Sequence, residues 1–432
     1  MIVIALIVLF LLAFAAAVTV AIRARNMQYW LWGYLTRQKP PKVAGPVHVM
    51  FCFVDHFEPN WGRVDMDTQR RRVDRWCTDY RALASRHRDA DGRVPQHSFF
   101  YPEEEYVEEH LDKIESLCAD GYGEIEIHLH HDNDTPDNFV ATIDRFNRLL
   151  HDRHHALPRD PVTGQLRFAF IHGNWCLDNS RADGRWCGID NELILLRELG
   201  CYADFTLPSA PSDTQTRMSN AIYYATDDPH KCKSHDTGVR MRVGGKPSGD
   251  LLIIQGVLGL NWKSRRFGII PRIENSDIRR GSPPTPSRVD QWVRTGIHVE
   301  GRPEWIFIKI HTHGTQEGDM DTLLGKPVDA MHDYLESTYN DGRDYVLHYV
   351  SAREMYNIAK AAEAGMTGDP GRYRDFELPK PGQKPPVGAA AAGATPVAVT
   401  PAGATPAAVT SAGATPVGAA SAAIPAPLTA SP

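Results

Sequence analysis

Histidine and acidic side chains cluster in the stretch GEIEIHLHHDND, residues 123–134. Three histidines and two aspartates stand at the end of an alternating pattern that predicts a β-strand. Imidazole and carboxylate groups are the usual protein ligands of divalent transition metals. Taken alone, the stretch fits a metal site or a polar turn, and the choice depends on what other segments bring to the same place.

Three further predicted strands end in side chains of the same kinds. The strand from residue 47 ends in Asp55, His56 and Glu58, the strand from 167 in His172, Asn174 and Trp175, and the strand from 304 in His311 and His313. Parallel strands present their carboxyl ends at one rim, where active sites of α/β folds lie. Because chance would scatter polar residues along the loops, their recurrence at four strand ends predicts a metal site at this rim.

Alternating strand and helix patterns must position these groups. Buried-strand patterns begin near residues 47, 98, 124, 167, 202, 251, 304 and 344, and amphipathic helices follow several of them. Repeated βα units of this kind predict an α/β fold with a parallel sheet, and we expect a (β/α) barrel of about seven strands rather than an open sheet. Residues 208–250 are polar and rich in turn formers, which predicts a long insertion or lid.

The two ends of the chain differ from this middle part. Residues 2–22 carry no charge and one polar side chain, which predicts a retained transmembrane helix, with a cleaved signal peptide as the alternative. The predicted parts are a transmembrane anchor at 1–22, a juxtamembrane linker at 23–45, a catalytic domain at 46–375 and a disordered Ala/Pro/Thr-rich tail at 376–432.

Charge and cysteine content bear on location and partners. Basic residues follow the apolar run and none precedes it, so the positive-inside rule predicts a single-pass membrane protein with a cytoplasmic catalytic domain. A periplasmic domain is the alternative. Seven cysteines at scattered spacings favour reduced thiols over a disulfide framework. The net charge of −6, without a basic block, argues against nucleic acid as a partner.

The order of the motifs resembles that of the polysaccharide deacetylases, the NodB-homology group of carbohydrate esterase family four. FCFVDHFEP stands where that family has an Asp-Asp pair, EIEIHLHHD where it has a His-x-x-x-His motif, FIHGNW at its groove motif and FIKIH at its late histidine. The resemblance covers roughly residues 47–365 and implies a NodB-like deformed TIM barrel. Two positions depart from the family pattern, since His56 replaces the second Asp and Asp132 replaces the second His.

The resemblance also implies a ligand set for a divalent metal, with zinc expected first and other first-row ions as alternatives. His56, His128 and Asp132 would hold it. His130 substitutes if the register differs, because His128 and His130 alternate onto one face of the strand.

By the same resemblance the chain would be a metal-dependent N-deacetylase acting on N-acetylated sugars of a cell-surface or exported polysaccharide or its precursor. Asp55 is then the expected general base and His311 the acid that protonates the leaving amine. His172, Asn174 and Trp175 are expected to hold the glycan by hydrogen bonds and stacking. The sequence predicts membrane attachment through the N-terminal helix and identifies no protein partner.

Two other functions fit the same residues. A metal-dependent glycoside hydrolase of a related barrel would need a second carboxylate, for which Glu58 or Asp178 is available. A non-catalytic glycan-binding protein would keep the fold without the chemistry. We expect His348, on a different strand and without clustered partners, to bind no metal.

Overall fold

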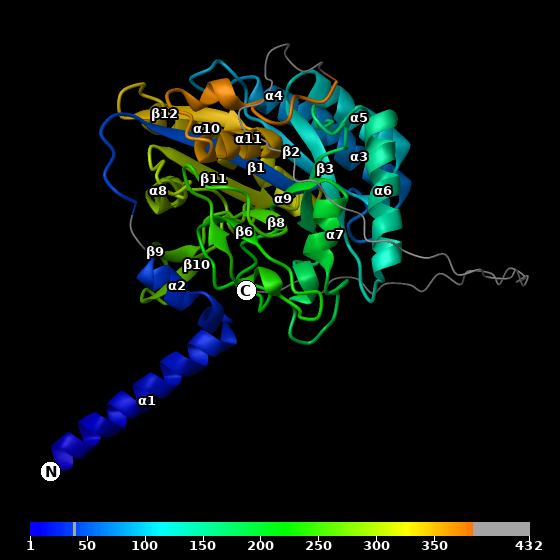
Figure 1. Ribbon diagram of the computed structural model, residues 1–432. Helices are drawn as coiled ribbons and strands as arrows, with labels where there is room; N and C mark the ends of the chain where they lie inside the picture. Colours follow the sequence, from blue (N-terminus) through cyan, green and yellow to red (C-terminus); the bar gives the residue numbers. More distant parts are fainter. Residues whose placement is uncertain (38–39, 383–432) are drawn as a thin grey trace, which may run out of the picture. The chain divides into compact units, whose positions relative to one another are not determined.

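The computed structural model describes residues 1–37 and 40–382, and a ten-stranded β-sheet is its central feature (Figure 1). Most of the predicted tail, residues 383–432, lies outside the described residues. The strands are β1 (Val47–His56), β2 (His97–Pro102), β3 (Gly123–Leu129), β4 (Phe168–His172), β5 (Cys201–Asp204), β6 (Ile222–Ala225), β7 (Val239–Arg240), β8 (Leu251–Ile254), β11 (Trp305–Thr312) and β12 (Tyr345–Val350). A separate two-stranded sheet contains β9 (Gly259–Arg266) and β10 (Ile270–Glu274).

Helices fill the connections between most of these strands. They are α1 (Ile2–Ala24), α2 (Leu31–Thr36), α3 (Met66–Arg75), α4 (Arg81–Ala84), α5 (Glu108–Ala119), α6 (Pro136–Asp152), α7 (Glu192–Glu198), α8 (Pro286–Thr295), α9 (Glu317–Leu323), α10 (Lys326–Tyr339) and α11 (Ala352–Glu363). The predicted parallel α/β architecture is therefore confirmed.

Pairing in the large sheet follows the order β11-β1-β2-β3-β4-β5-β8-β6-β7, while β12 also pairs with β1. Strand β1 shares one edge between two partners, since residues 47–52 pair with β12 and residues 53–56 pair with β2. The pairs among β1–β5, β8, β11 and β12 are parallel, and β6 runs antiparallel to β7 and β8.

The sheet differs from the expected barrel in two respects. It has ten strands rather than about seven, and within residues 1–37 and 40–382 no strand ladder joins β11 to β8 or β7. The segment 208–250 is also not a separate lid, because it contributes β6 and β7 to the sheet. Strand β6 has only four residues, all of them buried. It is stabilised by its pairing with β8 and not by a strand pattern in its own sequence.

Local sequence explains the elements that carry the candidate site. The last eight residues of β1 are all buried, as expected for a parallel strand covered on both faces. Helix α6 begins after Thr135, whose side chain accepts a hydrogen bond from the Asn138 N–H (3.2 Å), and Pro136 stands in its first turn. Phe139 and Ile143 lie on its buried face.

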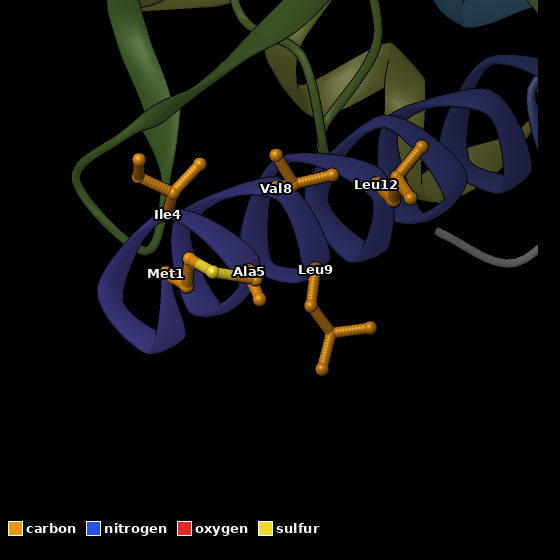
Figure 2. Close-up of a pocket in the computed structure, with 6 residues that line it drawn as sticks. All are labelled: Met1, Ile4, Ala5, Val8, Leu9 and Leu12. Carbon is orange, nitrogen blue, oxygen red and sulfur yellow. The ribbon is translucent and has the colours of Figure 1, made fainter.

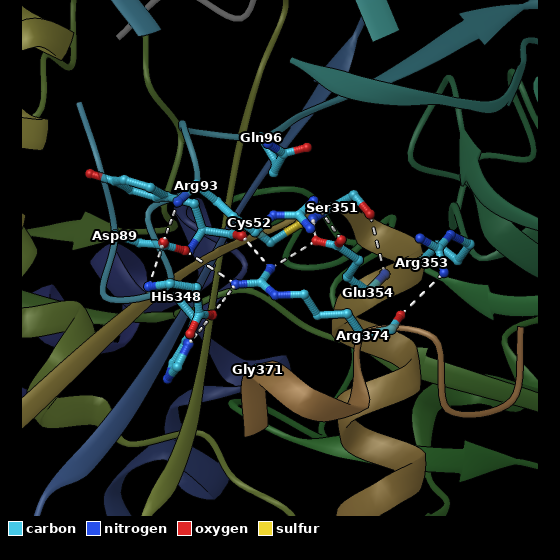
Figure 3. A network of polar contacts seen from close by, with 12 residues as sticks. Cys52, Asp89, Arg93, Gln96, His348, Ser351, Arg353, Glu354, Gly371 and Arg374 are labelled. Carbon is cyan, nitrogen blue, oxygen red and sulfur yellow. Dashed lines mark hydrogen bonds and ion pairs between the residues drawn. The ribbon is translucent and has the colours of Figure 1, made fainter. Parts of the chain in front are cut away.

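A buried polar network ties the segment after α11 to the sheet (Figure 3). The Arg374 guanidinium donates to Glu354 (3.0 Å), Asp89 (3.1 Å) and Asp91 (2.8 Å). Arg353 forms a bidentate pair with Glu124 on β3, at 2.8 and 3.0 Å. These charge-assisted hydrogen bonds fix the end of the domain against the strands that carry the site.

The N-terminal helix α1 contributes nothing to the core. None of its residues is buried, and it is long and apolar enough to cross a membrane. Figure 2 shows apolar side chains of its first half, among them Ile4, Val8 and Leu12, projecting from the ribbon. Beyond α1, Trp30 is fully buried against Ala210 and Leu258, so the chain joins the folded body just before α2.

Candidate metal centre

Glu58, just past the end of β1, is a buried carboxylate around which three histidines meet. Its Oε1 lies 3.1 Å from His128 Nε2 and 3.3 Å from His130 Nε2, and its Oε2 lies 3.4 Å from His313 Nδ1. His128 is in β3, His130 follows the end of β3, and His313 follows β11. Three separate segments therefore converge at the carboxyl ends of the parallel strands.

His56, the last residue of β1, completes the group. Its ring centroid lies 4.7 Å from that of His128 and 4.5 Å from that of His313. His56, Glu58 and His128 each offer a donor atom within 4.8 Å of the other two. The Nδ1 atom of His56 is buried without a hydrogen-bond partner, which is costly unless a ligand engages it.

Hydrogen bonds behind the group orient two of its imidazoles. His128 Nδ1 lies 3.1 Å from the carbonyl oxygen of Ile171, and His130 Nδ1 lies 2.5 Å from Glu104 Oε1. The Ile171 carbonyl can only accept, so the neutral ring of His128 carries its proton on Nδ1 and directs Nε2 at Glu58. Burial opposes protonation of His130, yet Glu104 and Glu58 raise its pKa well above the ordinary value, so His130 is protonated between the two carboxylates. Such outer contacts from a carbonyl or a carboxylate are what metal-binding histidines usually have.

The ionisation states also suit a cation. Burial, together with the nearby His313 and His128, holds the pKa of His56 well below its ordinary value, so its imidazole is neutral. Burial opposes ionisation of Glu58, yet His313, His128 and His130 hold its pKa well below the usual range. Metal binding needs neutral imidazoles and an ionised carboxylate. The residues present therefore fit a divalent ion with nitrogen and oxygen ligands.

The structure brings some of the expected ligands together and leaves one of them apart. His56 and His128 lie together, and His130 joins them through Glu58. Asp132 is exposed and belongs to none of the ligand groups among the described residues. Strand β3 ends at Leu129 and the chain then turns outward, so Glu58 supplies the carboxylate that the resemblance assigned to Asp132.

Asp55, the expected general base, faces away from this group. Adjacent residues of a strand point to opposite faces, and Asp55 Oδ2 lies 2.9 Å from His97 Nε2. Its Oδ1 accepts the Gly314 N–H at 2.6 Å, and a side chain at Gly314 would place Cβ 2.0 Å from Asp55. With both oxygens engaged, Asp55 anchors the loop that carries His313.

Trp175, His311 on β11 and His313 just after this strand form the next layer. The Trp175 ring stacks on His56 at 5.0 Å and meets His311 edge-on at 5.1 Å. Burial and Lys309 hold the pKa of His311 well below its ordinary value, so His311 is neutral. Burial also opposes protonation of His313, but Glu58 and other carboxylates raise its pKa, so the proton resides there.

The sequence placed His313 at the rim without giving it a role. Its spacing from His311 was an available signal, because residues two apart share a strand face. His313 is also partly accessible to solvent, with 28% of its side chain exposed.

A second buried group lies beside β4 and contains His172, which was expected to hold the glycan. His131 stands between Asp134 (3.0 Å) and Glu192 (3.2 Å), and His172 Nε2 lies 4.0 Å from Glu192. Burial opposes protonation of His131, yet the two carboxylates raise its pKa to about 9. A protonated imidazole is an ion-pair partner rather than a ligand.

The neighbours of His172 are unequal in exposure. His172 itself is fully buried, and its Nδ1 accepts the Asn174 N–H at 3.2 Å. Asn174 and Trp175 are half-buried. Of the three residues expected to hold substrate, Trp175 is the one that touches the Glu58 group.

A third group lies at the opposite end of β1. His48 Nδ1 and His348 Nε2 are 2.9 Å apart, His348 Nδ1 lies 2.9 Å from Asp91, and Asp369 is close by. The expectation that His348 lacks clustered partners is wrong. Its neighbours come from β1 and from segments distant in sequence, which no local pattern reveals.

Comparison with known proteins gives no family for this chain. No protein-family model matches it, and no curated protein matches it.

Proposed function

We propose that this chain is a metal-dependent hydrolase of amide bonds that removes acetyl groups from N-acetylated glycans. The observation that carries the proposal is the ionised Glu58 surrounded by His56, His128 and His130. The order of motifs, which resembles that of polysaccharide deacetylases, supplies the substrate class. Zinc is the first candidate ion, since it accepts mixed imidazole and carboxylate ligands.

His56, Glu58 and His128 would hold the ion, with His130 as a further donor. A divalent ion bound there would polarise the acetamide carbonyl and lower the pKa of a coordinated water. His56, Glu58 and His128 already have the protonation states that this task requires. Glu104 and Glu58 raise the pKa of His130 well above its ordinary value against the effect of burial, so His130 has to release a proton before it can coordinate.

Proton transfer falls to His311 on β11 and His313 just after it. His311 is neutral and its buried Nδ1 has no partner, so it can accept a proton as general base. His313 carries a proton beside Glu58 and can give it to the leaving amine. Trp175 offers an indole face against which the apolar face of a sugar ring can stack. Asp55 positions the His313 loop through Gly314.

Two features argue against the glycoside-hydrolase alternative. Glu58 is surrounded by histidines rather than facing an open cleavage point. Asp178 is fully buried, and burial together with Asp227 raises its pKa to about 9. Its Oδ2 accepts the Ser234 N–H at 2.5 Å, which gives it a role in holding a loop.

The proposal extends to the fold and to the membrane. The Lys309 Nζ on β11 donates to the Phe205 carbonyl after β5 at 2.6 Å, which supports a sheet curled toward a deformed barrel. Helix α1 would anchor the chain, with the catalytic part on the cytoplasmic side because basic residues follow the span. Substrates there would be nucleotide- or lipid-linked precursors.

Metal analysis paired with acetate release tests the function. The full chain, purified in detergent, should hold about one divalent ion and release acetate from N-acetylated oligosaccharides. His128→Ala should lose both. The control is His332→Ala, another buried histidine, which contacts the Tyr349 hydroxyl (3.0 Å) and belongs to none of the ligand groups in the described part of the chain. Equal metal content in wild type and His128→Ala would refute the site.

A further inference from the structure

The small β9–β10 sheet exposes large apolar side chains beside the N-terminal segment. Figure 1 shows this hairpin next to α2. The exposed fractions are 56% for Trp262, 79% for Phe267 and 73% for Ile269. Phe267 stands at the tip with a φ of 52°, a conformation that bulky residues rarely adopt. Clustered exposure of this kind marks a binding surface.

The same hairpin is strongly basic. Lys263, Arg265, Arg266 and Arg272 are all exposed, and residues 259–273 contain no Asp or Glu. The Arg266 guanidinium lies 5.3 Å from the centroid of the Phe267 ring, so charge and apolar surface share the tip. In a chain whose net charge is −6, this is a local excess of the opposite sign.

The hairpin is fixed to the segment that follows α1. Leu260 and Ile273 pack against the buried cluster around Trp30. Tyr34 of α2 lies so close to Gly259 that a Cβ there would be 3.0 Å from its ring. The hairpin is therefore attached close to the point where the apolar helix ends.

Helix α2 continues this surface. Its partly buried Tyr34 faces the hairpin, while Trp32 is 77% exposed and Leu35 is 63% exposed. Two elements that are packed on each other thus present aromatic and aliphatic side chains to solvent, next to a helix able to span a bilayer.

We propose that the hairpin tip and the exposed side of α2 insert into the headgroup region of the bilayer that α1 spans, and that the hairpin binds anionic phospholipid headgroups. Aromatic side chains favour this interfacial layer, and basic side chains next to it are attracted by anionic lipid. The inference rests on the proposed membrane anchor and is independent of the metal site. It would hold the catalytic body in one orientation on the membrane surface.

Fluorescence of a probe attached at single cysteines tests the inference. The full chain with Cys232→Ser, which removes the exposed native thiol, carries an environment-sensitive fluorophore at Phe267→Cys, Leu12→Cys or Val162→Cys. Val162 is 90% exposed on the turn before β4 and serves as the matched control. Each protein is reconstituted into phosphatidylcholine vesicles with and without phosphatidylglycerol.

We expect brominated lipids to quench the probes at positions 12 and 267 and to leave the probe at 162 unchanged. Quenching at 267 should increase with phosphatidylglycerol and fall at high salt. Arg265→Gln and Arg266→Gln should each weaken it about fivefold. Quenching at 12 but not at 267 would overturn the hairpin proposal while the anchor stands, and quenching at neither would overturn the anchor. A change in the emission of the probe at position 267 that depends on protein concentration in detergent would indicate self-association, and it would also refute the hairpin proposal.

Discussion

Gly173, directly after β4, is the position where one added methyl group would disturb the candidate metal centre without removing a ligand. A Cβ built there lies 2.3 Å from Cδ2 and 2.6 Å from Nε2 of His130. The Gly173 backbone cannot move away easily, because its N–H donates to the Leu129 carbonyl at 2.8 Å. In Gly173→Ala the His130 ring must therefore yield.

The displacement follows from ordinary contact distances. Carbon atoms in contact stand ~3.5–4.0 Å apart, so the ring must move by at least about 1 Å. That motion breaks its contacts with Glu58 (3.3 Å) and Glu104 (2.5 Å). Misplacement of this size typically costs about 100-fold in rate, and loss of outer contacts costs ~10–100-fold in metal affinity. Acetate release and metal titration of Gly173→Ala measure the two losses.

Gly188→Ala is the matched control. Its Cβ would lie 2.0 Å from Cε1 of His131, so it overpacks a histidine of the neighbouring group, and neither glycine has a positive φ. Both variants should lose ~1–3 kcal/mol of unfolding free energy from overpacking. Full activity and metal affinity in Gly173→Ala, or equal losses in the two variants, would refute a role for His130 in the centre.

Three further predictions follow from buried charges. His313→Gln should keep the metal and lower kcat by ~10²–10⁴-fold with little change in KM, and it should remove the fall in kcat of the wild type at high pH, because the acid must be protonated. Burial lowers the pKa of Lys309 to about 7. Above pH 7 the unfolded chain therefore keeps a proton on this side chain that the folded chain has lost, so the free energy of unfolding rises with pH. Denaturant titrations in detergent should show a rise of roughly 2–3 kcal/mol between pH 7 and 9 that Lys309→Met lacks. Arg353→Met leaves Glu124 buried without its partner and should cost ~3–5 kcal/mol in the same assay, with partial recovery in the double variant that also carries Glu124→Gln.

Local patterns predicted the parts of the fold that local sequence stabilises. The apolar run of β1 and the cap and buried face of α6 are examples, because burial on two faces or on one helix stripe leaves a period in the sequence. Strand β6 left no such signal, since its four residues depend on pairing with β8. The order of the strands was not predictable either, because it depends on pairing between distant segments, such as β1 with β11, which periodicity does not encode.

The candidate site was predictable to the level of strand ends, but not of individual ligands. His56 and His128 were reachable because each ends or nearly ends a strand with a clear pattern. The choice of Glu58 rather than Asp132 as the carboxylate was not predictable, because the loops after β1 and β3 decide which of the two turns inward. Glu104 belongs to an acidic run that has the composition of a solvated turn, yet it holds the ring of His130.

The shared edge of β1 has a consequence for how the chain folds during synthesis. His48 pairs with Trp305 on one side and Val346 on the other, so β1 leaves the ribosome long before either partner exists. Such distant pairing is slow and leaves an apolar strand exposed in the meantime. If α1 has already entered the membrane, the waiting strand is tethered at the bilayer surface, and the sheet around the candidate centre can be completed only after β12 has been translated.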